Sequence, residues 1–241
     1  MERIYALPKS ASHFHLFDKD SFIKAHDSYK AAKAGDAEAA FTLIKDLALD
    51  FLLTIQNKVP HHCIFVSPYA QEATGDNAIP LILSLVCADI FKGTSEIDIV
   101  QLQRVFHTGA DPMERLISRP SFEGAVQPNK NYILVDDVTS MGGTLADLAN
   151  YIQINNGIVC GTITLVNAGR EKEFTAFTKH IKLLQERFGD EIRKQFGIHI
   201  PALTANEASY LVGFRTIDEI RNRCLKAEKE RHLRLLSKGY V

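Results

Sequence analysis

The sequence predicts an α/β fold, in which a mostly parallel sheet carries helices on both faces and is flanked by N-terminal helices and a C-terminal helical appendage. Short apolar segments alternate with segments of helical periodicity between residues 61 and 169, which is typical of a parallel sheet covered on both sides. The chain before this region shows only helical patterns. After residue 170 it contains several helical segments and no further strand pattern.

The N-terminal segment, residues 1–60, carries two helical patterns, over 22–34 and 37–56. Asp36 stands between them, and Asp is favoured as the residue that caps the N-terminus of a helix. Apolar side chains recur at about helical spacing along the second pattern. We therefore expect this helix to pack one face on the core.

Within the core, residues 61–169, four apolar segments indicate strands and two periodic segments indicate helices. The expected strands cover 62–66, 97–100, 132–135 and 158–166, and the expected helices cover 77–91 and 144–154. Pro80 must lie in the first turn of its helix, because proline is tolerated there and not in a helix interior.

The C-terminal appendage, residues 170–241, shows only helical patterns, over 171–188, 190–196, 207–212 and 217–236. The charges of the last pattern alternate in sign at helical spacing, which is typical of a solvated face with ion pairs. No aromatic residues that could stack on bases are interleaved with these charges. We therefore do not expect this helix to bind nucleic acid.

Composition argues against several classes of protein. The formal net charge is −1, so there is no overall basic field to attract nucleic acid or membrane phosphates. No apolar stretch reaches the roughly 18 residues of a membrane span, and the N-terminus has no signal-peptide core. The four cysteines form no CxxC pair, which favours buried thiols over a zinc site. We expect a cytoplasmic protein without membrane contacts.

The segment NYILVDDVTSMGGTL, residues 131–145, places two adjacent aspartates at the end of a predicted buried strand. Because the two carboxylates repel each other, we expect a group from outside the protein to hold them together. Ligands of parallel α/β sheets bind at the carboxyl ends of the strands. Carboxylates accept hydrogen bonds from cis-diols and anchor Mg²⁺ through water, so Asp136 and Asp137 are candidate ligand-binding residues.

The loop that follows the aspartates is suited to a phosphate group. Gly142 and Gly143 allow a close approach of the backbone, and the hydroxyl groups of Thr139, Ser140 and Thr144 add donors. The loop leads into a predicted helix, whose N-terminus attracts anions. It matches neither the Walker motif nor the dinucleotide fingerprint. A ribose 5-phosphate would satisfy both the aspartates and the loop.

The run ILVDDVTSMGGTL, residues 133–145, resembles the phosphoribosyl-pyrophosphate (PRPP) signature of the type I phosphoribosyltransferases, and the resemblance extends from about residue 63 to 166. The stretches QRVFHTG and MERLISRPSFEGAV are similar to the competence-type (ComF-like) members. The resemblance implies that a nitrogen atom of a nucleobase-like acceptor displaces pyrophosphate from PRPP, with Mg²⁺ on the diphosphate.

The resemblance also implies a role for individual residues. Asp136 and Asp137 would be the catalytic pair that holds the ribose 2- and 3-hydroxyls, and no residue is implied as a direct metal ligand. The connection 104–122 would be a flexible flap over the site. The residues implied to bind PRPP are Ser67, Pro68, Tyr69, Arg104, His107, Thr139, Ser140, Met141, Gly142, Gly143 and Thr144.

The flap can also be interpreted without the family. A connection of this length between strands is uncommon unless it is functional. It carries four side chains suited to a diphosphate, Arg104, His107, Arg115 and Arg119. Each of these residues, taken singly, is also compatible with an ordinary solvated loop.

Three features depart from the family pattern. The N-terminal region has no zinc ribbon, and the first loop, SPYAQEATGDNA, has no Lys or Arg, so pyrophosphate binding is either weaker or depends on the flap. Ser140 stands where hypoxanthine- and guanine-type enzymes have Asp, which argues against a 6-oxopurine acceptor.

The departures leave two alternatives to an enzyme. One is a non-catalytic regulator that senses PRPP or a nucleotide, and the other is a ComF-like protein of DNA uptake or of a mobile element. For the enzyme, we expect a homodimer whose partners are PRPP and a small-molecule acceptor.

Overall fold

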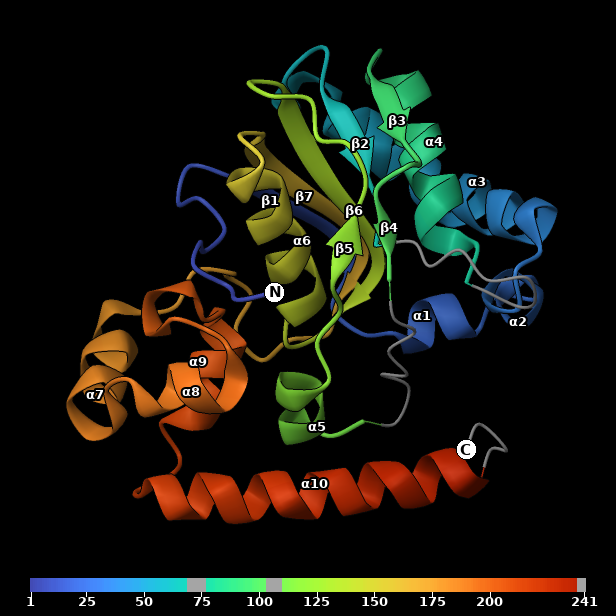
Figure 1. Cartoon of the computed structure of the whole chain (residues 1–241). Coiled ribbons are helices and arrows are strands. Elements are labelled where there is room, and N and C mark those ends of the chain that lie inside the picture. The colour runs from blue at the N-terminus through green and yellow to red at the C-terminus, as the bar shows by residue number, and fades with distance from the viewer. Residues whose placement is uncertain (69–76, 103–109, 238–241) are drawn as a thin grey trace.

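The computed structural model describes residues 1–68, 77–102 and 110–237 (Figure 1). Its main sheet has five strands in the order β1-β7-β6-β2-β3, and all neighbouring strands are parallel. The strands are β1 (Ser12–Phe17), β2 (Ile64–Val66), β3 (Thr94–Glu96), β6 (Asn131–Thr139) and β7 (Ile158–Asn167). Two short strands, β4 (Val100–Gln101) and β5 (Phe122–Glu123), form a separate antiparallel pair.

Helices cover both faces of the sheet, which confirms the predicted fold class (Figure 1). The helices of the core are α1 (Ser21–Lys24), α2 (Tyr29–Lys33), α3 (Ala37–Thr54), α4 (Ile79–Ile90) and α6 (Gly143–Ile154). α2, α3 and α4 pack on one face, and α6 packs on the other. Strand β6 is buried on both sides, because its apolar residues contribute alternately to the two clusters.

The N-terminal segment contributes a strand that the helical prediction did not include. β1 lies at the edge of the sheet and pairs in parallel with β7 over most of its length. Its sequence, SHFHLF, has only three strongly apolar residues, and its place in the sheet depends on hydrogen bonds to a strand far along the chain. The capping prediction is confirmed, since the Asp36 side chain accepts a hydrogen bond from the backbone N–H of Ala39.

Two boundaries in the middle of the core also differ from the prediction. A strand was expected at 97–100, but β3 ends at Glu96, β4 begins at Val100, and Ile99 in the segment between them is buried. A run of apolar residues indicates burial and does not by itself fix which residues pair with a neighbouring strand. Pro80 lies in the first turn of α4, as predicted.

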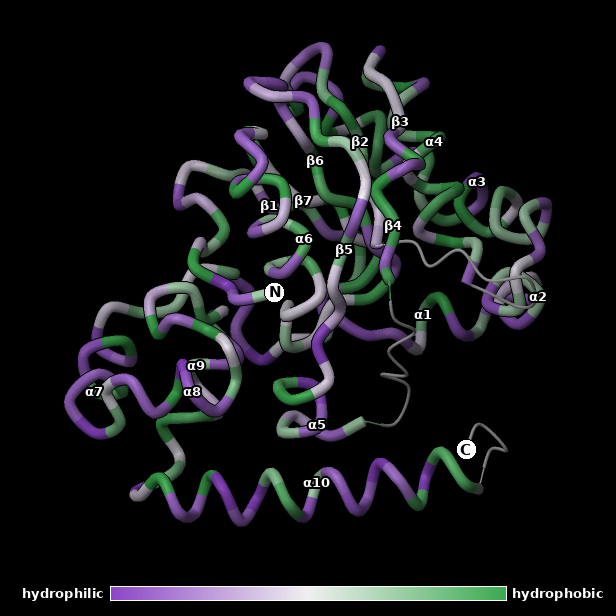
Figure 2. The backbone as a smooth tube through the Cα atoms, viewed as in Figure 1, coloured by the Kyte–Doolittle hydropathy of each residue, from purple (hydrophilic) through white to green (hydrophobic). Residues whose placement is uncertain are grey.

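The C-terminal residues form a third hydrophobic core of their own. Its helices are α7 (Thr178–Phe188), α8 (Glu191–Phe196), α9 (Ala205–Leu211) and α10 (Ile217–Ser237), and we call residues 170–237 the C-terminal module. Hydrophobic and hydrophilic residues alternate along α10 (Figure 2). The predicted helix over 171–188 begins only at Thr178. Residues 171–174 line a cavity beside the core, and Thr175 forms an isolated antiparallel bridge with Thr204.

The described part of the connection between β4 and β5 also contributes to this third core. It contains a helix that the sequence did not predict, α5 (Pro112–Ile117), whose Met113 and Leu116 are buried with residues of the C-terminal module. Arg223 of α10 forms an ion pair with Asp111, the N-cap of α5, at 2.6 Å. The described part of the predicted flap is therefore anchored to α10.

Candidate functional site

The candidate site lies where three parallel strands end at the same edge of the sheet. β6 ends with Asp136, Asp137 and Thr139, β2 is followed directly by Ser67, and β7 ends with Asn167. The register pairs Val66 with Leu134, so Ser67 follows its strand close to the aspartates on the neighbouring strand. Parallel α/β sheets bind their ligands at this edge. The fold thus brings together the aspartates and the serine that sequence reasoning selected.

Asp137 is buried and is held by three donors of the protein itself. Its Oδ2 accepts hydrogen bonds from Lys33 Nζ at 2.8 Å and from Asn77 Nδ2 at 3.0 Å, and its Oδ1 accepts one from the backbone N–H of Val138 at 2.9 Å. Burial alone would raise the pKa of Asp137. The pKa is nevertheless lowered, because the Lys33 ammonium stabilises the carboxylate.

The expectation that only an outside group holds the two aspartates together is therefore wrong for Asp137. Lys33 lies on α2, 104 residues earlier in the chain, and no local pattern marks it as a partner. Asn77 precedes α4, which packs on the same face of the sheet as α2.

Asp136 is half-buried and far less engaged. Its Oδ1 accepts a hydrogen bond from the backbone N–H of Asp137 at 2.8 Å, and its Oδ2 accepts none from the residues that the structure describes. Burial raises the pKa of Asp136 well above the usual range, and the neighbouring Asp137 carboxylate raises it further. A carboxylate offers about four acceptor sites, so Asp136 keeps more of them for a ligand than Asp137 does.

The signature loop, residues 139–143, leads into α6 through a left-handed residue. Gly142 is the N-cap of α6 and has φ 77°, a conformation that favours glycine. A Cβ atom at Gly142 would lie 3.1 Å from the Phe174 ring, and one at Gly143 would lie 2.8 Å from Glu207 Oε1. The two glycines were predicted to let a ligand approach. In the structure they allow a close approach of the C-terminal module to the loop.

Direct bonds join the C-terminal module to the signature loop. The Thr204 hydroxyl donates a hydrogen bond to the carbonyl oxygen of Met141 at 2.6 Å. Thr204 also caps α9 in a capping box with Glu207. Glu207 in turn accepts hydrogen bonds from Arg3, which is fully buried and also donates to Asp147 of α6 at 2.8 Å. Buried charges thus link the N-terminus, α6 and the C-terminal module.

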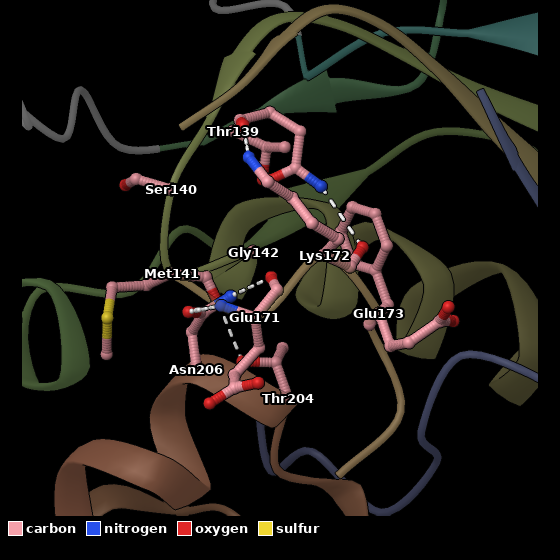
Figure 3. A pocket seen from close by; sticks show the side chains of 11 residues that line it. Thr139, Ser140, Met141, Gly142, Glu171, Lys172, Glu173, Thr204 and Asn206 are labelled. Carbon is pink, nitrogen blue, oxygen red and sulfur yellow. Dashed lines mark hydrogen bonds between the residues drawn. The ribbon is translucent and has the colours of Figure 1, made fainter. Parts of the chain in front are cut away.

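The signature loop and the C-terminal module together line a small cavity (Figure 3). Asn206 fixes the backbone of Glu171 at the edge of this cavity. Its side chain donates to the carbonyl oxygen of Glu171 at 2.8 Å and accepts from the N–H of Glu171 at 2.9 Å. The cavity is lined by residues 139–142, 167, 171–174, 204 and 206. Sequence reasoning selected residues 139–142 and missed the rest, because the helical pattern of residues 170–241 gave no sign that they return to the loop.

The remaining predicted residues have different outcomes. The Ser67 hydroxyl is buried and has no hydrogen-bond partner among residues 1–68, 77–102 and 110–237. Pro68 is half-buried beside it. Tyr69, Arg104 and His107 lie outside the described residues.

Two other arginines of the predicted flap lie in the described part of the chain. Arg119 does not point a free cation at the site, since its guanidinium pairs with Asp147 and donates to the carbonyl oxygens of Phe196 and Gly197. It therefore ties the core to the C-terminal module, and its assignment to a diphosphate is wrong. Arg115 donates to the carbonyl oxygen of Ala110 at 3.1 Å.

Neither a metal cluster nor a membrane helix occurs among the residues that the structure describes. Within residues 1–68, 77–102 and 110–237, no three His, Cys, Asp or Glu side chains gather closely enough to hold a metal ion. None of the helices described is both long and apolar enough to cross a membrane. All four cysteines are free thiols. Cys63, Cys87 and Cys224 are buried, as predicted, whereas Cys160 is only half-buried.

Comparison with known proteins gives matches of very different length. The chain is 36% identical over 211 residues to protein TraN of Escherichia coli, a match that covers 84% of this chain and 46% of TraN. It is 38% identical over 45 residues to an adenine phosphoribosyltransferase of Ureaplasma parvum, covering 19% of this chain and 26% of that enzyme. The chain thus spans less than half the length of either protein. No family model matches the sequence.

Solved structures similar to this chain include two phosphoribosyltransferases. The adenine phosphoribosyltransferase of Leishmania donovani has a TM-score of 0.35 and 12% identity, over 75% of this chain and 79% of that one. The hypoxanthine phosphoribosyltransferase of Staphylococcus aureus has a TM-score of 0.34 and 10% identity, over 62% and 85% respectively.

Proposed function

We propose that this chain binds PRPP at the carboxyl edge of its sheet and transfers the ribose 5-phosphate to a nitrogen acceptor, with release of pyrophosphate. One arrangement carries the proposal: the half-buried Asp136 carboxylate, the buried Ser67 hydroxyl and the signature loop at the start of α6 lie at one edge of the sheet. The Ser67 hydroxyl has no partner among the residues that the structure describes. Carboxylates suit the vicinal hydroxyls of ribose, and loop N–H groups at a helix N-terminus suit its phosphate. The 45-residue similarity to an adenine phosphoribosyltransferase supports the same class of reaction.

The two aspartates would have different tasks in this reaction. Asp136 would accept hydrogen bonds from the ribose hydroxyls, because most of its acceptor sites are available. Asp137, fixed by Lys33 and Asn77, would hold the end of β6 in place and keep a negative charge beside Asp136. Fixed groups that orient the sugar and exclude water contribute to catalysis without a protein nucleophile.

The residues present also fit Mg²⁺, the cofactor expected from the family resemblance. A hard cation prefers oxygen ligands and keeps several waters, and Asp136 offers carboxylate oxygen to such a water. A nearby cation would also lower the raised pKa of Asp136 and keep it ionised. When bound, Mg²⁺ would supply positive charge to the leaving diphosphate.

Two measurements test the proposed function. Calorimetry with PRPP should show binding that strengthens with Mg²⁺, and ribose 5-phosphate should bind more weakly. Pyrophosphate release should then be measured with a panel of nucleobases. Absence of heat and of thermal stabilisation with every 5-phosphorylated ribose would refute the assignment.

A non-catalytic sensor of PRPP is the second candidate, and one observation favours it. The C-terminal module contacts the signature loop through Thr204 and Glu207, so a phosphate bound there would act on contacts that hold the module. A protein that binds PRPP and releases no pyrophosphate with any base would fit this candidate. The similarity to competence-type proteins, the homodimer and the acceptor stay predictions.

A further inference from the structure

We infer that Lys33 of α2 binds the diphosphate of PRPP and so supplies the cation that the first loop lacks. The inference rests on the proposed function and names a residue for which no motif gave a signal. Loop residues 67–78, SPYAQEATGDNA, contain no Lys or Arg that could neutralise a diphosphate. A leaving group of that charge requires a cation nearby.

The position of Lys33 meets this requirement. Its Nζ lies 2.8 Å from Asp137 Oδ2, at the strand end that carries the aspartates, and its side chain is 33% exposed. An ammonium group has three donors, and the structure shows one of them donating to Asp137. The ammonium group therefore lies at the site on a partly exposed side chain and retains donors for an anion.

The charge of Lys33 is also secured. Burial opposes protonation, but the neighbouring Asp137 carboxylate outweighs it, and the pKa of Lys33 is raised. The ion pair fixes the ammonium beside Asp136, where the ribose would bind. A cation held in place before the ligand arrives loses less freedom on binding than a mobile surface lysine does.

A purely structural role is the alternative to be separated. In that case Lys33 would only neutralise Asp137 and would act on every ligand of the site alike. A diphosphate contact would affect PRPP and leave ribose 5-phosphate, which has the same sugar and phosphate, almost unchanged. The two roles therefore differ in whether the affinity falls for PRPP alone or for both ligands.

The test uses the full chain and compares three variants by calorimetry with PRPP and with ribose 5-phosphate. Lys33→Met removes the ammonium, Lys33→Arg keeps a cation, and Lys30→Met is the matched control, since Lys30 is an exposed lysine on the same helix. We expect Lys33→Met to weaken PRPP binding by about ten- to hundredfold, as for the loss of a hydrogen bond to a charged group, and ribose 5-phosphate binding by less than about threefold. Lys33→Arg should retain most of the affinity for PRPP, and Lys30→Met should leave the affinity for both ligands unchanged.

Other results would overturn the inference. If the affinities for both ligands fell equally, Lys33 would act only through Asp137. If neither affinity fell, the ion pair of Lys33 with Asp137 would have no role in binding. If Lys33→Met does not fold, Lys33→Gln replaces it, because the neutral amide can still donate to Asp137. A wild-type chain that binds neither ligand would refute the proposed function itself, which keeps the two failures distinct.

Discussion

The two aspartates allow a prediction in which one chemical change has opposite consequences at adjacent positions. Asp137→Asn removes a carboxylate that accepts hydrogen bonds from Lys33, Asn77 and the backbone of Val138, with the Lys33 bond at 2.8 Å. Asp136→Asn removes a carboxylate that accepts one hydrogen bond from the described residues, which the oxygen of an asparagine can also accept. The first change should destabilise the fold and the second should not.

The magnitude follows from the contacts that are lost. A hydrogen bond to a charged group contributes roughly 1.5–3 kcal/mol, and an asparagine oxygen at position 137 would keep part of this set. We therefore expect Asp137→Asn to lower the free energy of unfolding by about 2–4 kcal/mol, while Asp136→Asn changes it by less than ~1 kcal/mol or raises it, since repulsion between the carboxyls is relieved. Urea unfolding at pH 7 measures both values.

The pH dependence gives an independent check on the same pair. The folded pKa of Asp136 is raised, so the stability that this group contributes is present below about pH 4 and is lost as the pH rises through the folded pKa. The folded pKa of Asp137 is lowered, so its contribution is present above about pH 4 and is lost as the pH falls. Asp136→Asn should thus gain stability relative to the wild type as the pH rises above about 4. The instability of Asp137→Asn relative to the wild type should be present above about pH 4 and should shrink as the pH falls below it.

Binding separates the two positions again. Asp136→Asn should stay folded and lose most of its affinity for PRPP, because Asp136 has the acceptor sites that remain for a ligand. The reasoning would be refuted if Asp136→Asn unfolded at least as readily as Asp137→Asn, or if it bound PRPP as the wild type does while the wild type bound tightly.

Three further predictions concern the contacts around the site. Arg3→Met should lower the free energy of unfolding by about 3–5 kcal/mol in urea, because it leaves a buried carboxylate without its partner; a loss below ~1 kcal/mol would contradict this. Thr204→Ala should lower the free energy of unfolding by about 1–2 kcal/mol and should speed amide hydrogen exchange in the signature loop around Met141. The control Thr216→Ala removes an exposed hydrogen bond to a helix N-terminus and should leave hydrogen exchange in that loop unchanged. His13 has its pKa lowered to about 4 by burial, so the wild type should lose stability as the pH falls from about 6.5 to 4, and His13→Gln should reduce that slope.

The sequence by itself determined the local features of this protein. The apolar run of β6, the two aspartates at its end and the glycines before α6 stand next to each other in the chain, so their order already indicated a strand, a loop and a helix. Alternating strands and helices indicated the parallel sheet in the same way. Such features depend on residues close in sequence, for which periodicity and turn chemistry are informative.

Only the tertiary structure decided which distant side chains meet at the site. Lys33 and Asp137 are 104 residues apart, and Arg3 and Glu207 are 204 residues apart, yet both pairs form hydrogen bonds of 2.8 Å or less. β1 is a strand because β7 offers it an edge, and α5 is ordered because α10 packs against it. No local pattern contains this information, since a charged residue looks the same whether it stays in solvent or pairs across the fold. The partners of the aspartates and the contacts of the signature loop are therefore products of packing between segments far apart in the chain.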